Sequence, residues 1–282
     1  MQAFISSIQD FVKDLQPKIK KFLLLKVGLG ILWNFEKVIP KFSLLGDTPF
    51  FEREQLDWVP ELEARWPLIR QELDEILKYR DELPNFQDIT PDIAASTSLD
   101  NLWKTYFFYG YGIKVENSCN RCPETARALE KIPGLKTAFF SILLPGKHIA
   151  EHRGPYKGVL RCLLGLKIPQ PQELCRIRVA NETRYWEEGK CLLFDDSFPH
   201  EAWNETDETR VVLFIDFVHP LRFPVSWINR LFVQLIALSP FIQDSGRNQQ
   251  KWDKRLEEVF SRARSETRSE ARSEEPTSNV KV

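Results

Sequence analysis

Short apolar runs separated by turn-forming residues fill the stretch between Pro133 and Pro220 and limit the folds open to this chain. The runs are rich in Val, Ile, Leu and Phe, and clusters such as Pro145-Gly146 and Glu188-Gly189 interrupt them. Many short strands at near-regular spacing indicate an all-β sandwich or barrel. The expected strands are 137–144, 159–168, 175–180, 190–194 and 210–218.

Helices are expected on both sides of this β-rich stretch. Apolar residues recur at three- and four-residue spacing from Phe4 to Phe22, which predicts an amphipathic helix. The same spacing from Leu62 to Ile76 predicts a second helix that stops near Pro84. Segment 225–238 is apolar with one Arg and predicts a further helix. Residues 261–282 are rich in Ser, Arg and Glu without apolar periodicity, which predicts a disordered tail.

The charge balance excludes one class of partner. The 282 residues carry 39 Lys and Arg against 40 Asp and Glu, a formal net charge of −1, which argues against a nucleic-acid binder. Residues 1–45 nevertheless carry seven Lys and three acids, a local charge of +4, whereas residues 49–82 carry ten acids and five bases. The basic first helix and the segment 227–242 are each too short to span a bilayer. Two interpretations stay open for both segments. The first, which we favour, is that they cover the β core, and the second is that they lie on a membrane surface.

The N-terminus and the cysteines indicate a compartment. The chain does not open with a basic region, a clean apolar core and a cleavage site, so no secretory signal is expected. Five cysteines are an odd and low number, which argues against a secreted disulfide scaffold. Cys119 and Cys122 form a single CxxC, for which a zinc site and a local disulfide both stay open. We therefore expect a cytoplasmic protein, with peripheral membrane association left open.

Histidine-based chemistry must come from a short list: His148, His152, His200 and His219. His152 lies between two expected strands, and His200 lies between two others. Histidines at the ends of different strands can converge inside a barrel, and imidazole binds Fe, Zn and Cu. A turn at 204–208 would bring Arg210 back antiparallel to the His200 strand and into the same interior. A buried guanidinium needs an anion, and a carboxylate matches it best.

These residues admit three interpretations. In the first, His152 and His200 bind a metal beside a carboxylate anchor at Arg210. In the second, the histidines lie in ordinary loops and Arg210 is a surface charge. In the third, the run from His148 to His152 matches the H-x-x-E-H pattern of zinc peptidases, but the Pro and Gly residues on both sides leave no room for the helix that pattern needs.

Several sequence blocks follow one another in this stretch: SILLPGKH from Ser141, HRGP from His152, LRCLLGL from Leu160, RVANET from Arg178, WEEGK from Trp186 and FDDSFPHEAW from Phe194. With the Arg210 strand that ends in His219-Pro220, they resemble the aspartyl/asparaginyl β-hydroxylase family of iron(II)- and 2-oxoglutarate-dependent dioxygenases. Upstream, Cys122-Pro-Glu-Thr and the helix around Trp66 are similar to the bacterial lipid A hydroxylase branch.

The resemblance implies a fold and a set of roles. The fold would be mainly β with flanking helices around a double-stranded β-helix (jelly-roll, cupin-like) core. His152 and His200 would be the catalytic iron ligands. Arg210 would hold the distal carboxylate of 2-oxoglutarate, Ser141 would hydrogen-bond it, and Arg161 would lie near cosubstrate and substrate. The reaction would consume O₂ and 2-oxoglutarate, hydroxylate a carbon, and release succinate and CO₂.

Three positions depart from the family pattern. Most such oxygenases carry the metal-binding carboxylate at the position of Gly154. The animal β-hydroxylases share the glycine, and the lipid A branch has Asp there. Leu163 stands where the family has a histidine that contacts the cosubstrate, and Val159 where the animal enzymes have a substrate-side arginine. Two substrate classes therefore stay open, an aspartyl or asparaginyl side chain of a protein or peptide, and an acyl chain of a membrane lipid. A non-catalytic jelly-roll protein that binds a metal or ligand is the alternative.

These expectations divide the chain into four parts. They are an amphipathic helical segment (1–46), the jelly-roll dioxygenase domain with its N-terminal helix (47–224), C-terminal helices (225–260) and a disordered tail (261–282).

Overall fold

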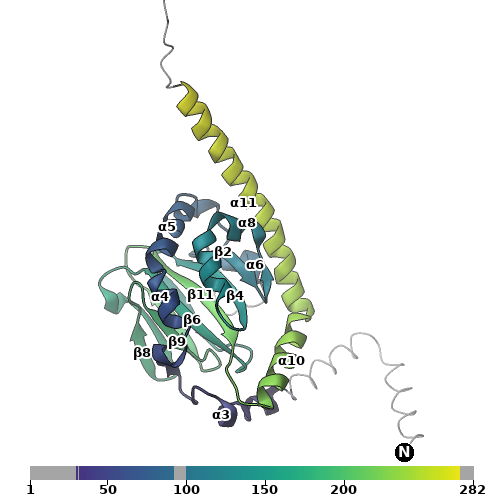
Figure 1. Cartoon of the computed structure of the whole chain (residues 1–282). Coiled ribbons are helices and arrows are strands. Elements are labelled where there is room, and N and C mark those ends of the chain that lie inside the picture. The colour runs from purple at the N-terminus through teal and green to yellow at the C-terminus, as the bar shows by residue number, and fades with distance from the viewer. Residues whose placement is uncertain (1–29, 31, 92–99, 274–282) are drawn as a thin grey trace, which may run out of the picture.

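The computed structural model describes residues 30, 32–91 and 100–273, and its centre is a pair of antiparallel β-sheets packed face to face (Figure 1). The larger sheet has the strand order β1-β9-β6-β11-β4-β2-β3, and the smaller has the order β5-β10-β7-β8. The helix expected from Phe4 to Phe22 lies outside the described residues.

The strands of the larger sheet are β1 (Phe50–Phe51), β2 (Trp103–Gly110), β3 (Ile113–Lys114), β4 (Leu135–Leu143), β6 (Val159–Lys167), β9 (Cys191–Phe194) and β11 (Arg210–Val218). Those of the smaller sheet are β5 (Lys147–His152), β7 (Cys175–Val179), β8 (Glu182–Tyr185) and β10 (His200–Asn204). All five strands expected with bounds are present to within a few residues. β10 was expected only as the strand of His200, without bounds, and β1, β2, β3, β5 and β8 were not expected.

The order in which the chain visits the two sheets defines a double-stranded β-helix. From β4 to β11 the chain passes from sheet to sheet, and β4, β6, β9 and β11 form the centre of the larger sheet. The partners of β11 are β4 and β6, and those of β10 are β5 and β7. This pairing of strands distant in sequence is the jelly-roll arrangement, so the expected mainly β fold with flanking helices is confirmed.

One expected connection is wrong. The turn 204–208 does not fold β11 back beside β10, because the two strands lie in different sheets. In a jelly roll the chain crosses to the opposite sheet at such a turn, and each strand pairs with a strand from another part of the chain. Arg210 reaches the interior all the same, from the sheet that faces His200.

Strand β11 shows how the larger sheet is buried on both faces. Val211, Leu213 and Ile215 point outward into a core under the helices. Val212 and Phe214, on the alternate positions, belong to a second core between the sheets. This period of two places Arg210 on the inner face, since it shares the parity of Val212.

The helices α4 (Val59–Ala64), α5 (Trp66–Leu77) and α9 (Pro123–Glu130) contribute to the outer core over the larger sheet. The helix expected from Leu62 to Ile76 is present, but it is broken at Arg65, the residue before the Trp66-Pro67 start of α5. Its apolar positions Ile69, Leu73 and Ile76 are buried. The remaining short helices are α3 (Ile39–Phe42), η1 (Arg53–Gln55), η2 (Arg80–Glu82), α6 (Phe86–Ile89), α8 (Glu116–Arg121) and η3 (Gln172–Leu174).

The C-terminal part is helical for longer than expected. After α10 (Val225–Ala237), α11 runs from Pro240 to Ser273, so the structure describes 261–273, expected as the start of a disordered tail, as helical. Extending a helix costs far less than starting one, and Arg, Ala and Glu are good helix formers, so a polar segment can continue an anchored helix. The anchors are Asp253 on Asn117 and Glu257 on Arg121.

The described helices were also compared with the requirements of a membrane span. No single one is long and apolar enough to cross a bilayer. Val225–Ala237 and Ile242–Ala263, bent by 61°, together pass by length and composition alone.

Candidate functional site

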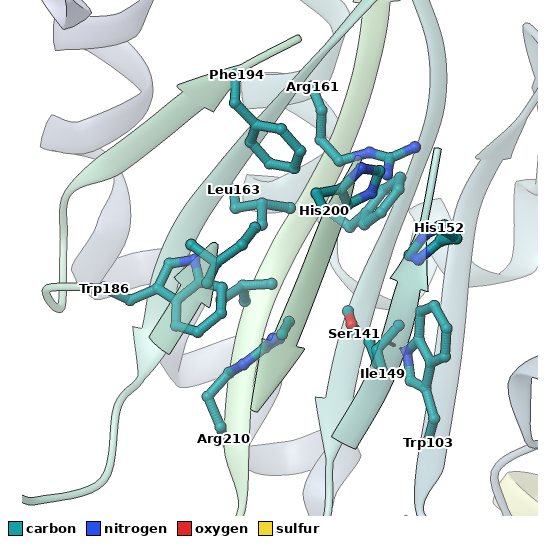
Figure 2. A pocket seen from close by; sticks show the side chains of 14 residues that line it. Trp103, Ser141, Ile149, His152, Arg161, Leu163, Trp186, Phe194, His200 and Arg210 are labelled. Carbon is teal, nitrogen blue, oxygen red and sulfur yellow. Dashed lines mark hydrogen bonds between the residues drawn. The ribbon is translucent and has the colours of Figure 1, made fainter. Parts of the chain in front are cut away.

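A pocket lies between the two sheets, and all five residues predicted from the sequence line it (Figure 2). Its volume, counted out to the solvent at its mouth, is about 410 Å³. The larger sheet supplies Ser141, Arg161 and Arg210, and the smaller sheet supplies His152 and His200. The double-stranded β-helix therefore brings together side chains that are far apart in the sequence.

The two histidines face each other across neighbouring strands. His152 ends β5, His200 begins β10, and the two residues are register partners. Their ring centroids are 4.2 Å apart, with the ring planes tilted by 52°. Two imidazoles at this separation can share one ligand.

A β-bulge turns His152 into the pocket. His200 pairs with His152 and Ala202 with Ile149, so Ala150 and Glu151 together oppose one residue of β10. Without the extra residue, the period of two would place Ile149 and His152 on opposite faces of the strand. The bulge puts both on the inner face, and both line the pocket.

Both rings are held in the form that binds metals. The Nδ1 atom of His152 lies 2.8 Å from the carbonyl of Ala150, and that of His200 lies 2.9 Å from the carbonyl of Phe198. A carbonyl only accepts, so each Nδ1 carries the proton and each Nε2 keeps its lone pair. Burial lowers the pKa of His152 and lowers that of His200 to about 3, which keeps both rings neutral. The Nε2 of His200 is buried without a hydrogen-bond partner.

An acidic cluster lies beside the histidines and encloses Gly154. Arg161 donates to Asp216 (2.8 Å) and forms an ion pair with Asp196 (2.8 Å). A Cβ atom at Gly154 would lie 2.2 Å from a carboxylate oxygen of Asp196, so the carboxylate absent from position 154 has no room there. Burial, opposed by Arg161, raises the pKa of Asp196 to about 7. With both carboxylates ionised the cluster has a net charge of −1, which favours a cation nearby.

Arg210 has the properties of an anion site. It is 2% exposed, and its Nε and Nη1 atoms have no hydrogen-bond partner. Its guanidinium carbon lies 4.3 Å from the ring centre of Trp186. Burial lowers the pKa of Arg210 to about 10. A buried guanidinium with unused donors, held over an aromatic ring, is suited to a carboxylate.

Ser141 and two tryptophans complete the wall around Arg210. The indole Nε1 of Trp103 donates to the hydroxyl of Ser141 at 3.0 Å, which leaves the serine proton for a ligand. Trp186 lies between Leu163 and Arg210 (Figure 2), and its Nε1 is buried without a partner. The sequence analysis did not select Trp103 as a site residue. The run of Thr, Tyr and Phe after it signals a strand and could have revealed it.

The positions that depart from the family pattern fall in two places. Leu163 lines the pocket and makes its wall apolar where the family has a histidine. Val159 instead packs beside Tyr156 and Val225 in a cluster under α10. The site therefore has fewer polar groups than the family pattern predicts.

The other two histidines serve the scaffold. His148 is half-exposed, bonds to Glu201 at 3.0 Å and stacks on Trp203. His219 is buried between the hydroxyl of Ser43 and the carbonyl of Lys157. Because His148 and His152 lie on a strand, the H-x-x-E-H peptidase interpretation is wrong.

The donors present limit what the pocket can hold. Over residues 30, 32–91 and 100–273, no group of three His, Cys, Asp or Glu side chains gathers around one point. The chain thus offers a metal two imidazoles, with Asp196 close by, and the remaining positions are left to small ligands. Iron, zinc and copper all accept imidazole. The unpaired Nε2 of His200 fits such an ion, and the unpaired donors of Arg210 fit a carboxylate.

Fold and pocket together define a jelly-roll protein with a two-histidine site and a buried arginine. A family model for aspartyl/asparaginyl β-hydroxylase matches residues 63–220, more than half of the chain. This chain belongs to the aspartyl/asparaginyl β-hydroxylase family, a family of hydroxylases.

Two curated relatives indicate how the match extends. The chain is 47% identical over 216 residues to an ornithine lipid ester-linked acyl 2-hydroxylase of Rhizobium tropici, covering 77% of this chain and 76% of that protein. It is 39% identical over 167 residues to the human aspartyl/asparaginyl β-hydroxylase, covering 57% of this chain but only 21% of the human protein. A Pseudomonas putida prolyl-4-hydroxylase structure aligns at a TM-score of 0.35 with 16% identity over 55% of this chain and 88% of that one.

Proposed function

We propose that this protein is an iron(II)- and 2-oxoglutarate-dependent dioxygenase that hydroxylates an acyl chain of a membrane lipid, with release of succinate and CO₂. The observation that carries the proposal is the meeting, in one pocket, of two neutral histidines oriented by backbone carbonyls and a buried arginine whose Nε and Nη1 have no hydrogen-bond partner. The first group suits a metal ion and the second suits the carboxylate of a cosubstrate.

The residues divide the work between them. His152 and His200 would hold iron(II) through Nε2, and Asp196 and Asp216 add negative charge beside it. Arg210 would bind the distal carboxylate of 2-oxoglutarate, with Ser141 as a second donor. Bound iron(II) would supply the activation of O₂, with one oxygen atom entering the product and the other entering succinate. The aromatic and aliphatic walls exclude water from the reacting groups.

Three observations support a lipid substrate over an aspartyl side chain. Most of the described lining residues are apolar, among them Ile149, Leu163 and Phe214. Arg161 is already engaged by Asp196 and Asp216, so it is not free to bind a substrate carboxylate. The relative with the longer alignment is named as an acyl 2-hydroxylase of ornithine lipid, whose acyl chain brings no charge into such a pocket.

A coupled assay tests the proposal. The full chain is incubated with iron(II), 2-oxoglutarate and O₂, and either ornithine lipid in detergent or an aspartate-containing peptide. Succinate is quantified, and mass spectrometry detects the gain of one oxygen atom. We expect oxygen on the ester-linked acyl chain, with His152→Ala inactive and His148→Ala, the matched histidine of the same strand, active.

The possible outcomes separate the alternatives. Oxygen gained only by the peptide would overturn the lipid assignment and leave the dioxygenase assignment standing. No succinate with any substrate, together with no binding of 2-oxoglutarate, would establish the non-catalytic jelly-roll alternative.

A further inference from the structure

Helix α10 exposes an apolar stripe that no other described element covers. Trp227, Leu231, Leu235 and Leu238 follow at helical spacing, and Trp227 is 66% exposed. Phe223, just before the helix, is 82% exposed. Trp33 and Leu44, in the segment packed against α10, are also exposed. We call α10 with Phe223 and Trp33 the apolar face.

The opposite side of α10 is buried against the protein. Val225, Asn229 and Val233 point inward, and Phe232 contacts Phe35 at a ring distance of 4.9 Å. These buried residues explain why α10 packs on the protein, but they do not explain why its opposite side is apolar as well. A helix of 13 residues with one side packed on protein cannot cross a bilayer.

The charges around the apolar face are basic. Arg222 and Arg230 are exposed, and the sequence has no acidic residue between His219 and Asp244. Lys37 and Lys41 are exposed on the neighbouring segment. The acidic residue there, Glu36, is occupied by Arg153 and by the backbone N–H of Lys157. Tryptophan and leucine rimmed by arginine and lysine are typical of helices that lie in an anionic lipid surface.

The apolar face adjoins the loop that leaves the metal site. Loop 153–158 follows His152 directly. Within it, the Tyr156 hydroxyl donates to Asn229 (2.6 Å), and the Gly158 carbonyl accepts from Asn229 (2.9 Å). The buried side of α10 is therefore hydrogen-bonded to the loop that follows His152, and the apolar face lies on the other side of the same helix.

We propose that the apolar face docks on an anionic lipid bilayer, with Trp227 and Leu231 inserted among the headgroups. This inference rests on the proposed function in that docking would bring the pocket to its lipid substrate. It adds the surface, its residues and the charge of the lipid that it recognises.

The test measures binding of the iron-free full chain to vesicles by flotation. Vesicles of phosphatidylcholine alone are compared with vesicles that also contain phosphatidylglycerol. We expect binding to the anionic vesicles, weakened about tenfold or more in the Trp227→Ser/Leu231→Ser double variant. Leu68→Ser is the matched control, because Leu68 is an exposed leucine on α5, across the molecule from α10 (Figure 1). Arg222→Gln/Arg230→Gln should reduce the preference for anionic lipid.

Each outcome decides a different point. Equal binding by the double variant and the wild type, or no binding by the wild type, would overturn the docking surface. A wild-type dimer that the double variant converts to a monomer, without vesicle binding, would make a second copy of the chain the occupant instead. Turnover of detergent-dispersed lipid by the wild-type protein is measured separately. If the wild-type protein binds vesicles but does not turn over the lipid, the result counts against the proposed function and not against docking.

Discussion

The pocket keeps buried polar atoms without partners, which is costly in a folded protein. The Nε2 of His200 and the Nε and Nη1 of Arg210 are buried and unpaired. Each such group costs roughly 1–3 kcal/mol relative to a satisfied one. Because the acceptor suits a cation and the donors suit an anion, two ligands of opposite charge relieve the cost.

Removing either pocket histidine should strongly weaken metal binding. In His152→Ala or His200→Ala one of the two imidazole donors that the described residues bring to the pocket is lost, so we expect iron(II) or manganese(II) affinity to fall about 100-fold or more. Titration calorimetry on the metal-free protein measures it. His148→Ala should keep the wild-type affinity, since the His148 ring bonds to Glu201 outside the pocket. Equal affinity in all three variants would place the metal elsewhere.

Arg210→Met should stabilise the ligand-free protein while it abolishes cosubstrate binding. Arg210 is a buried cation with two unpaired donors, so replacing it with an apolar side chain of similar length removes a desolvation cost, and the unfolding free energy should rise by roughly 1–3 kcal/mol. Urea unfolding and 2-oxoglutarate titration measure the two effects. Arg184→Met, at an exposed arginine, should change neither greatly. A destabilised Arg210→Met protein would show that Arg210 serves the fold and not a ligand.

His219 should make stability depend on pH. Its Nδ1 donates to the Lys157 carbonyl and its Nε2 accepts from Ser43, so the ring is neutral, and burial lowers its pKa from the ordinary 6.5. Below about pH 6.5 His219 is protonated in the unfolded chain but stays neutral in the folded chain. The unfolding free energy therefore decreases as the pH is lowered, by up to about 1.4 kcal/mol per pH unit.

The comparison with His219→Gln isolates this contribution. The other buried histidines affect both proteins alike, so the difference in unfolding free energy between wild type and variant should shift by up to about 2 kcal/mol, in favour of the variant, from about pH 6.5 to about pH 5. A difference that does not change with pH would mean that His219 is protonated in the folded state.

At the level of elements, the sequence predicted where strands occur better than it predicted which of their side chains face the pocket. The strands around β6 and β11 are apolar on both faces, and a continuous apolar run is visible in one sequence. β5 (KHIAEH) has only two apolar residues, Ile149 and Ala150, which are adjacent, so it shows neither an apolar run nor an alternation and was missed. Its bulge at Ala150 and Glu151 depends on pairing with β10, and no local signal in the sequence marks it. The sequence therefore offered His152 as one candidate metal ligand, and the resemblance favoured it, but the direction of its side chain came from the structure.

The connections show the same limit. The residues of turn 204–208 signal a turn but do not say whether the next strand joins the same sheet or the opposite one. That choice depends on β11 finding β4 and β6, which is a long-range event. The continuation of α11 to Ser273 likewise depends on an anchored helix upstream, which composition alone does not reveal.

Helix α10 should contribute to stability through its buried side. Asn229→Ala removes the partner of the Tyr156 hydroxyl and of the Gly158 carbonyl in a fully buried position, so unfolding free energy should fall by roughly 2 kcal/mol. Gln234→Ala, at an exposed position of the same helix, should lie within about 0.5 kcal/mol of the wild type. If the two variants were equally stable, α10 would not be coupled to loop 153–158.

At the scale of the whole molecule, the two sheets have different surroundings. The larger sheet is buried on both faces, by the helices outside and the smaller sheet inside. The smaller sheet is exposed along its outer face, as the alternation of buried and part-exposed residues in β7 and β10 shows. The pocket draws Arg210 and Ser141 from the larger sheet and its histidines from the smaller one, so a ligand that contacts both sides would tie the two sheets together.

The two ligands should therefore stabilise the whole fold. Manganese(II), an iron substitute that O₂ does not oxidise readily, and 2-oxoglutarate should each raise the thermal midpoint of unfolding. At a hundredfold excess over its dissociation constant, each ligand should add about 2.7 kcal/mol to the unfolding free energy. Together they should stabilise more than the sum, because the metal and Arg210 would hold opposite ends of one cosubstrate. Differential scanning fluorimetry measures this in wild type, His200→Ala and Arg210→Met, with chelator as the reversal control. A 2-oxoglutarate effect that survives in Arg210→Met, or a metal effect that survives in His200→Ala, would contradict the assignment of that residue.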